Sequence, residues 1–288
     1  MSDIVALGEL LIDFAPDGTA NPGGAPCNFL VAAKKYGASC EFIGKVGKDQ
    51  YGEMLCDTLT NAGVGTNGLV WDDKHETTKA FVKLDNNGDR SFSFIRGADI
   101  ALEEREINYS IVRECKIFHF AGSLSLTDDP CRNTLKKVVK YAKKRNKLVS
   151  FDPNLREPLW KGDLERAREE LLWGLENADI VKISDDEYEF LGEPDFMHNK
   201  MVMITAGSNG ATLLNAKARV DIACPKVKPI DTTGAGDIFA GAAIAKILEI
   251  GKDPAELSEE ELKTIGEFAC TKASLSTEKM GAIPSIPE

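Results

Sequence analysis

The segment Asp231–Asp237, with the sequence Asp-Thr-Thr-Gly-Ala-Gly-Asp, holds the residues best suited to chemistry. It leads directly into Ile238–Ile250, which is apolar on nearly every side and therefore predicts a buried helix. The first N–H groups and the positive dipole end of that helix would favour an anion above Gly234, Ala235 and Gly236. Small residues at these positions let the backbone approach such a ligand closely.

Asp237 would lie beside that anion, where a carboxylate is electrostatically costly and needs a reason to be present. A general base that removes the proton from an attacking hydroxyl is one such reason. The alternative is structural: Asp237 caps the helix, and the glycines only make a tight turn. The heptapeptide by itself leaves both interpretations open.

Composition and charge limit the classes of partner. The chain of 288 residues has a formal net charge of −11, which argues against nucleic acid, because phosphate backbones need a basic face. The absence of a run of about 18 apolar residues argues against a membrane span, and no signal peptide precedes the first apolar segment, so we expect a cytoplasmic protein. The seven cysteines form no C-x-x-C pair and predict reduced thiols, and the scattered histidines predict no histidine metal site.

The elements that would position these residues alternate along the chain, which predicts a parallel sheet with helices on both faces. The expected strands are Ile4–Leu10, Cys40–Ile43, Ile117–Ala121, Leu148–Asp152, Ile180–Ile183, Met201–Thr205, Ala211–Leu214 and Val220–Ala223. The expected helices, besides the one after Asp237, are Cys27–Tyr36, Gln50–Ala62, Cys131–Arg145, Leu164–Glu176, Asp185–Leu191 and Glu259–Ser276. We expect the tail Gly281–Pro287 to be extended.

The alternation breaks between about Leu69 and Arg96. There Thr78–Leu84 and Ser91–Arg96 have strand-like sequences on either side of a turn sequence, Asp85–Gly88. A hairpin that interrupts a doubly wound sheet indicates a separate small β layer, and an ordinary surface hairpin is the alternative.

Polar residues and glycines follow several expected strands, where open α/β sheets place their ligand groups. Asp13 after the first strand and Asn28 near a helix start offer hydrogen bonds that suit a polyol. Arg156 shares a loop with Asn154, and its guanidinium suits phosphate oxygens. The stretch Thr205–Gly210, a strand followed by a glycine turn, could form a wall for a nucleotide. Turn, cap or surface ion-pair roles are the alternatives for each.

Two of these segments resemble the signatures of the ribokinase-like (PfkB) sugar kinase family. Asp231–Asp237, continued through Gly241, is similar to D-T-x-G-A-G-D, and Gly23–Asn28 is similar to G-G-x-x-x-N. The resemblance covers essentially the whole chain. It implies a ribokinase-like three-layer αβα sandwich with a mostly parallel central sheet, a single kinase domain over residues 1–288, and a β lid from about residues 10–22 and 68–97.

The family's site residues carry over as expectations. Asp237 would be the base, and the N–H groups of Gly234, Ala235 and Gly236 would hold the charge of the transferring phosphoryl group. The expected sugar contacts are Asp13, Gly24, Asn28 and Arg96, and the expected ATP contacts are Asn154, Arg156, Thr205, Gly207 and Gly210. Glu187 would help to hold Mg²⁺ through water, and a monovalent cation, usually K⁺, would lie near Asp231 and Thr233. Cys270 stands where many relatives have Asn near the adenine pocket, which leaves the purine contacts there open.

The stretch Asp152–Trp160 and the serine at Ser184 resemble fructokinases, which implies ATP-dependent phosphorylation of D-fructose to fructose 6-phosphate. Ketodeoxygluconate kinase and ribokinase are alternatives within the family, and the resemblance is compatible with a monomer or a homodimer. A dinucleotide-dependent oxidoreductase would need G-x-G-x-x-G after the first strand, where only Gly8 is present. A non-catalytic sugar-binding regulator should have lost Asp237 or Gly236, and both are present.

Overall fold

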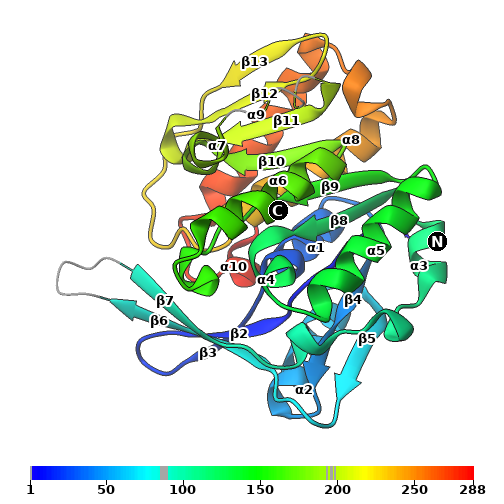
Figure 1. Cartoon of the computed structure of the whole chain (residues 1–288). Coiled ribbons are helices and arrows are strands. Elements are labelled where there is room, and N and C mark those ends of the chain that lie inside the picture. The colour runs from blue at the N-terminus through cyan, green and yellow to red at the C-terminus, as the bar shows by residue number, and fades with distance from the viewer. Residues whose placement is uncertain (1, 85–89, 193, 195–196, 198) are drawn as a thin grey trace.

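A computed structural model describes residues 2–84, 90–192, 194, 197 and 199–288, and within them two separate sheets (Figure 1). The large sheet has the strand order β13-β12-β11-β10-β9-β8-β1-β4-β5, in which β12 pairs antiparallel with both β11 and β13 and the other neighbouring pairs are parallel. Its strands are β1 Ile4–Leu7, β4 Cys40–Gly47, β5 Gly65–Asp72, β8 Ile117–Ala121, β9 Leu148–Asp152, β10 Ile180–Ser184, β11 Met201–Thr205, β12 Ala211–Leu214 and β13 Arg219–Ile222.

Helices cover both faces of this sheet. The helices are α1 Ala25–Lys35, α2 Gln50–Asn61, α3 Tyr109–Glu114, α4 Gly122–Thr127, α5 Cys131–Lys144, α6 Leu164–Asn177, α7 Asp185–Leu191, α8 Ala235–Ile250, α9 Glu259–Ser276 and α10 Ala282–Ser285. Residues of α1, α2, α8 and α9 share one core with one sheet face, and residues of α3, α5, α6 and α7 share a second core with the other face. Because side chains alternate along a strand, Ile4 and Ala6 of β1 enter the first core while Val5 and Leu7 enter the second. The expected αβα sandwich is confirmed.

The second sheet is small and has the strand order β3-β2-β6-β7, formed by β3 Ala20–Gly23, β2 Leu11–Phe14, β6 Thr78–Leu84 and β7 Arg90–Ile95. It extends from one end of the sandwich, beside α10 and α2 (Figure 1). The hairpin strands expected from the break in alternation are therefore present, whereas the turn sequence Asp85–Gly88 lies outside the described residues.

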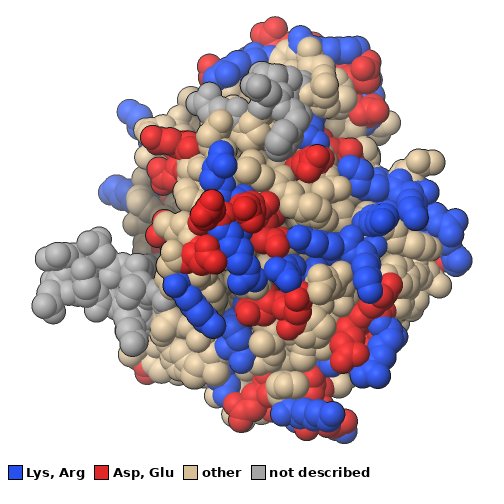
Figure 2. Space-filling view, viewed as in Figure 1, with Lys and Arg blue, Asp and Glu red and all other residues tan. Residues whose placement is uncertain are grey.

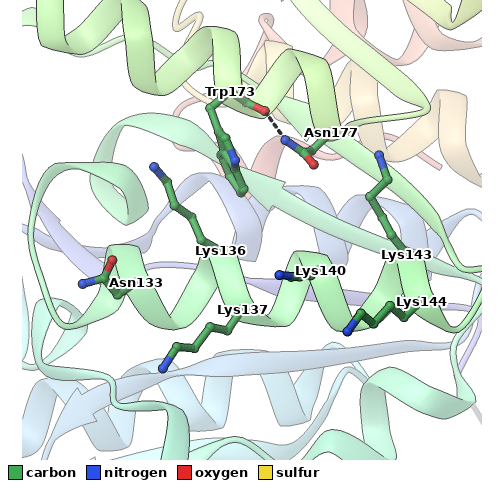
Figure 3. A pocket seen from close by; sticks show the side chains of 8 residues that line it. All are labelled: Asn133, Lys136, Lys137, Lys140, Lys143, Lys144, Trp173 and Asn177. Atoms are coloured by element: carbon green, nitrogen blue, oxygen red, sulfur yellow. Dashed lines mark hydrogen bonds between the residues drawn. The ribbon is translucent and has the colours of Figure 1, made fainter.

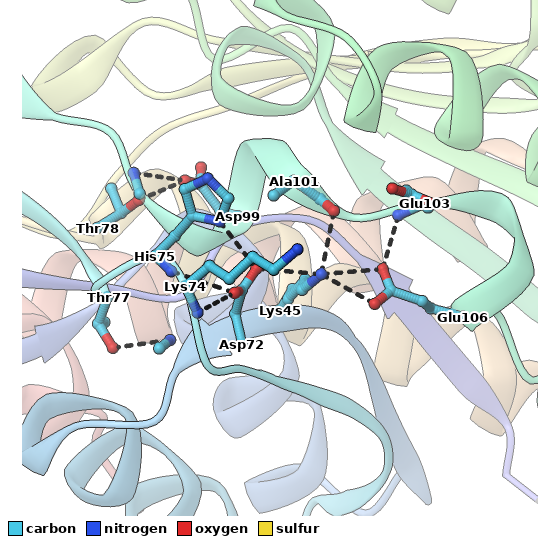
Figure 4. A network of polar contacts seen from close by, with 12 residues as sticks. Lys45, Asp72, Lys74, His75, Thr77, Thr78, Asp99, Ala101, Glu103 and Glu106 are labelled. Atoms are coloured by element: carbon cyan, nitrogen blue, oxygen red, sulfur yellow. Dashed lines mark hydrogen bonds and ion pairs between the residues drawn. The ribbon is translucent and has the colours of Figure 1, made fainter.

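Two carboxylates, the half-buried Asp49 and the buried Asp99, hold the start of β6 against the rest of the protein. Asp49 accepts hydrogen bonds from the N–H and the hydroxyl of Thr77, both at 2.8 Å. Asp99 accepts one from the hydroxyl of Thr78, which in turn accepts one from the N–H of Gly97 at 2.7 Å (Figure 4). The base of the small sheet is thus held by side-chain hydrogen bonds to charged acceptors, which are stronger than neutral ones.

Several local expectations were wrong. Gly65–Asp72 was not expected as a strand, yet it forms β5 of the large sheet, so residues 68–72 do not belong to the small sheet. The strand was not recognised because glycine weakens a strand pattern in the sequence. A Cβ on Gly68 would lie 2.5 Å from the carbonyl oxygen of Phe42, so close pairing with β4 requires glycine there. The tail expected to be extended contains the short helix α10, which follows Gly281 in a positive-φ conformation. No described helix combines the length and apolarity that crossing a membrane would need.

Candidate active site

Helix α8 does not begin in the way that the structural alternative, a cap formed by Asp237, requires. Its N-cap is Gly234, with φ of 75° and no side-chain cap, and Asp237 is the third residue of the helix. The carboxylate Oδ2 of Asp237 accepts a hydrogen bond from Nδ2 of Asn28 at 2.8 Å. Asp237 therefore does not cap α8, and its carboxylate is directed to the start of α1 instead.

This contact joins the two signature segments, which lie 209 residues apart in the sequence. The other amide atom of Asn28, the buried Oδ1, has no hydrogen-bond partner among the described residues. A buried acceptor without a partner is costly in a folded protein. An oxygen that is unsatisfied beside an acidic side chain is suited to accept a hydrogen bond from a ligand hydroxyl.

Protein surrounds the Asp237 carboxylate closely enough for desolvation to raise its pKa, although the side chain keeps some exposure. The hydrogen bond from Asn28 and the charges of Lys182 and Arg156 act in the opposite direction. Burial also raises the pKa of Asp13 to about 6, with Arg156 lowering it and Asp237 raising it further. Asp13 on β2, Asn28 on α1, Asp237 on α8 and the loop residue Arg156 are thus brought together from four parts of the chain.

Lys182 is a residue of this region that the sequence analysis missed. It lies on β10, and its Nζ forms an ion pair with Oδ2 of Asp152 at 3.1 Å. A Cβ built on Gly236 would lie 3.0 Å from this Nζ, so the ammonium is adjacent to the first turn of α8. The sequence contained one signal, since a lysine interrupts the otherwise apolar run Ile180–Ile183 of a central strand.

The loop after β9 is held in place by its own backbone contacts. Asn154 adopts φ of 43°, and its N–H donates to Oδ1 of Asp152 at 3.1 Å. The N–H of Leu155 donates to Oε1 of Glu187 at 2.6 Å, and the N–H of Arg156 donates to the Ser123 hydroxyl at 2.8 Å. The side chain of Arg156 is exposed, and its guanidinium contacts only the Leu155 carbonyl among the described residues. It can therefore reach toward an anion in front of α8.

The glycine turn after β11 lies two strands further along the same sheet edge, with β10 between β9 and β11. Thr205 ends β11, and Gly207 and Gly210 have φ of 53° and 105°. A Cβ on Gly210 would lie 2.0 Å from the carbonyl oxygen of Ile222, so glycine is needed for the turn itself. The structure therefore supplies a packing reason for this glycine, and its predicted contact with nucleotide stays a prediction.

The guanidinium of Arg96 is engaged by the protein itself. It donates to Oδ2 of Asp99 at 2.6 and 3.0 Å, to the Thr127 hydroxyl at 2.8 Å and to the Leu124 carbonyl at 2.7 Å. In this conformation Arg96 ties the end of β7 to α4. Gly24, the other sugar contact expected from the signature, is the N-cap of α1, and a Cβ there would lie 2.7 Å from the Glu9 carbonyl oxygen.

One of the N–H groups expected to hold charge is also in use. The Ala235 N–H donates to the carbonyl oxygen of Thr232 at 3.2 Å. The same stretch of chain is pinned by Asp231, whose Oδ1 accepts from the N–H and hydroxyl of Thr233 and whose Oδ2 accepts from the Gly281 N–H. These bonds fix the turn that presents Gly234 and Gly236 at the start of α8.

The residues expected near cations, Glu187, Asp231 and Thr233, offer oxygen atoms that already take part in hydrogen bonds within the protein. Both carboxylate oxygens of Glu187 accept backbone N–H groups, from Leu155 and Ser184. Each oxygen has a further lone pair, which suits contact with the water shell of Mg²⁺. Asp231 and Thr233 likewise offer oxygen donors of the kind that K⁺ accepts. Among the described residues, no group of three or more His, Cys, Asp or Glu could hold a metal by itself.

Cys270 is buried in α9, and burial together with the neighbouring Cys224 raises the pKa of its thiol. The thiol is therefore neutral near pH 7 and acts as a small apolar group at this position.

A hollow of about 680 Å³ lies elsewhere on the described surface, between α5 and α6. It is lined by Asn133, Lys136, Lys137, Lys140, Lys143, Lys144, Trp173 and Asn177. Lys136 lies over the Trp173 ring, and the other four lysines are exposed (Figure 3). Basic side chains gather over α5 in Figure 2. Lys136 is neutralised by Glu170 at 2.7 Å. None of the predicted site residues lines this hollow, which lacks a carboxylate or nucleophile.

Comparison with known proteins gives a consistent result. The sequence pattern of the "pfkB family carbohydrate kinase" matches residues 1–288. A probable fructokinase-3 from Arabidopsis thaliana is 38% identical, with 99% of this chain and 88% of that protein covered. The structure of an uncharacterized sugar kinase from Pyrococcus horikoshii in complex with ATP is similar with a TM-score of 0.88, 36% identity, and coverage of 99% and 95%. That of a fructokinase from Vibrio cholerae O395 with fructose, ADP and calcium ion bound has a TM-score of 0.87, 29% identity, and coverage of 100% and 96%.

Proposed function

We propose that this chain, which belongs to the pfkB family of carbohydrate kinases, transfers the γ-phosphoryl group of ATP to the primary hydroxyl of D-fructose and forms fructose 6-phosphate. The observation that carries the proposal is the Asn28–Asp237 hydrogen bond, which joins both signatures at the N-terminus of a buried helix. The fructose-bound and ATP-bound relatives support the two substrates.

The acceptor hydroxyl would lie between Asp237 and Asn28. Asp237 would take its proton as the phosphoryl group arrives, while the unpartnered Oδ1 of Asn28 and the carboxylate of Asp13 accept hydrogen bonds from other sugar hydroxyls. Phosphoryl transfer depends mainly on positioning and on stabilisation of charge. Both are served by a base whose side chain is already oriented by Asn28 before substrate binds.

ATP would lie along the carboxyl ends of β9, β10 and β11, against Asn154, Thr205, Gly207 and Gly210, with Arg156 contacting its phosphates. Mg²⁺, when bound with the nucleotide, neutralises part of the phosphate charge, and Glu187 would hold its water shell. A monovalent cation near Asp231 and Thr233 would act on the turn before α8. The calcium ion in the Vibrio cholerae fructokinase supports a divalent cation in such a site.

A neutral sugar is favoured over ketodeoxygluconate by the state of Arg96. Ketodeoxygluconate carries a carboxylate that needs a cationic partner, and among the expected sugar contacts Arg96 is the cationic one. Its guanidinium is instead neutralised by Asp99. Ribokinase remains an alternative on the same chemistry, whereas a non-catalytic sugar binder has no need of Asp237.

We expect fructose to be the best substrate by at least about tenfold in kcat/KM, which corresponds to about 1.4 kcal/mol of transition-state discrimination. The measurement is coupled ADP release with fructose, ribose, ketodeoxygluconate, glucose and adenosine at matched concentrations. Heat-inactivated protein gives the background. A higher kcat/KM for ketodeoxygluconate or ribose than for fructose would refute the assignment, and no sugar-dependent ADP release at all would refute kinase activity.

We further propose that residues 1–288 act as one kinase domain in which the small sheet is a lid over the sugar. Because Asp49 and Asp99 hold the start of β6 by hydrogen bonds to Thr77 and Thr78, we expect the small sheet to move as a unit. Fructose should slow amide hydrogen exchange in the described strands β6 and β7 by about tenfold or more, while β9 in the large sheet stays unchanged. Equal exchange with and without fructose, measured by mass spectrometry at saturating sugar, would contradict a moving lid.

A further inference from the structure

Lys182 is a buried cation in the region where charge must be transferred. Lys182 is 8% exposed, and its Nζ lies 3.1 Å from Oδ2 and 3.4 Å from Oδ1 of Asp152. A buried ammonium group is costly unless it is paired, so a lysine on a central strand requires a compensating interaction. Asp152, itself 2% exposed, supplies that compensation.

The ion pair with Asp152 does not by itself require Lys182 to lie close to the start of α8, yet it does so. Its Nζ would be 3.0 Å from a Cβ on Gly236, the second residue of α8. Glycine at this position therefore leaves the ammonium next to the helix N-terminus, where a larger side chain would displace it. An ammonium has three donors, and one carboxylate does not use all of them.

The surroundings of Lys182 are acidic. Asp152, Glu187 and Asp237 all act on it electrostatically, and Asp13 lies close to Asp237. The whole chain has a net charge of −11. A phosphoryl group that enters this region meets several carboxylates, and Lys182 and Arg156 are the cations that face Asp237 among the described residues. Of these two, Arg156 is exposed and Lys182 is fixed within the sheet.

We propose that Lys182 is a further catalytic residue of the kinase reaction: its ammonium, next to Gly236, stabilises the transferring phosphoryl group and keeps Asp237 ionised. The inference rests on the proposed function. Lys182 makes and breaks no bond. Its fixed charge is already in place at the start of α8, so little reorganisation is needed when negative charge develops there.

A second buried pair in the same protein provides a matched control. Lys45 is also 8% exposed, and its Nζ lies 3.1 Å from Oδ2 of the buried Asp72, with Glu106 at 2.9 Å (Figure 4). Lys45 lies on β4, which is separated from β10 by β9, β8 and β1. At the usual strand spacing this is about 19 Å across the sheet. The two lysines are equally exposed and each lies 3.1 Å from an aspartate oxygen, but Lys45 is far from α8 and has Glu106 as a second carboxylate partner.

The decisive experiment compares two sets of variants. The first set is Lys182→Met, Asp152→Asn and the double variant of both, and the control set is Lys45→Met, Asp72→Asn and the double variant of both. Both single lysine variants should lose stability, because each leaves a buried carboxylate unpaired. The Lys182–Asp152 double variant should recover much of the lost stability, and the Lys45–Asp72 double variant less of it, because Glu106 stays without its ammonium partner. For the Lys182–Asp152 double variant we expect kcat to remain about 10²–10³-fold below wild type, the usual loss for one stabilising donor, while the Lys45–Asp72 double variant stays within about threefold. A folded Lys182→Met/Asp152→Asn enzyme with kcat within about threefold of wild type would overturn the proposal.

A binding measurement separates this proposal from the choice of sugar. Calorimetric titration with AMP-PNP and with ADP needs no sugar turnover, and Lys182→Met should weaken AMP-PNP at least about tenfold more than ADP, because the analogue carries the γ-phosphoryl group. Equal weakening of both nucleotides would contradict a role at the transferred group. If wild type phosphorylates no sugar, the proposed function fails, and this comparison still reports on Lys182.

The pH profile gives a third readout, which a structural ion pair would not move. Removing a positive charge beside Asp237 disfavours its ionised form and raises its pKa further. The acidic limb of kcat should therefore shift to higher pH in Lys182→Met. The groups that face Asp237 are Asn28 and Cys27 on α1, Asp13 on β2, Asp152 on β9, Arg156 after it, and Lys182. If the acidic limb of the kcat–pH profile of Lys182→Met stayed at the wild-type pH, Lys182 would have no role in keeping Asp237 ionised.

Discussion

Replacing Asp237 with asparagine should lower kcat by about 10²–10⁴-fold, the usual contribution of a positioned general base. The substitution preserves the size and shape of the side chain, and no cap of α8 is lost because Asp237 makes none. Sugar and nucleotide affinity should change little, or increase, because a negative charge beside the phosphates is removed. Steady-state kinetics with fructose and ATP, together with calorimetric titration of both ligands, measure these quantities separately.

The matched control is Asp57→Asn, an exposed aspartate on α2, which should leave kcat within about threefold because isolated surface substitutions have small effects. The wild-type rate should fall as the pH drops through the raised pKa of Asp237, since only the carboxylate accepts a proton. The residual rate of Asp237→Asn should lack that acidic limb. A folded Asp237→Asn protein that binds both ligands and turns over at near the wild-type rate would refute the assignment of the base.

Replacing Gly234 with alanine should reduce both stability and turnover. Gly234 has φ of 75°, which costs an L-residue about 1–2 kcal/mol. A Cβ there would also lie 2.4 Å from Cβ of Ala282 in α10, so overpacking should cost about 1–3 kcal/mol more. The clash must move the start of α8 or α10, and a displacement of about 1 Å at a reacting centre lowers kcat by about 10²-fold.

The C-terminal end of the same helix provides the control. Gly251 has φ of 72°, and the nearest atom to its Cβ would be 3.9 Å away. Gly251→Ala should therefore show only the conformational cost in urea denaturation and keep kcat within about threefold. If Gly234→Ala matched Gly251→Ala in both stability and kcat, the contact with α10 would have no part in positioning the start of α8.

Elements with local signals could be predicted from the sequence. Helices α7 and α9 have the bounds that were expected, and in both a serine N-cap and a glutamate three residues later form a reciprocal capping box. Their start is therefore encoded within four consecutive residues. The same holds for the signature after Ile230: an all-round apolar helix preceded by small residues predicted the buried α8 and its open N-terminus.

Interactions between distant segments could not be predicted in this way. The β5 strand depends on how closely Gly68 approaches β4. The role of Arg96 depends on Asp99, which neutralises it, and on α4, which accepts its hydrogen bonds. The local pattern identified Asp237 and Asn28 as functional candidates, but only folding places Nδ2 of one against Oδ2 of the other and leaves Oδ1 of Asn28 unpartnered. The sequence shows Lys182 only as a lysine within a strand, whereas the tertiary structure buries it beside Asp152 and Gly236. Periodicity and caps act within one or two turns of chain, whereas desolvation and charge pairing are set by which segments meet in space.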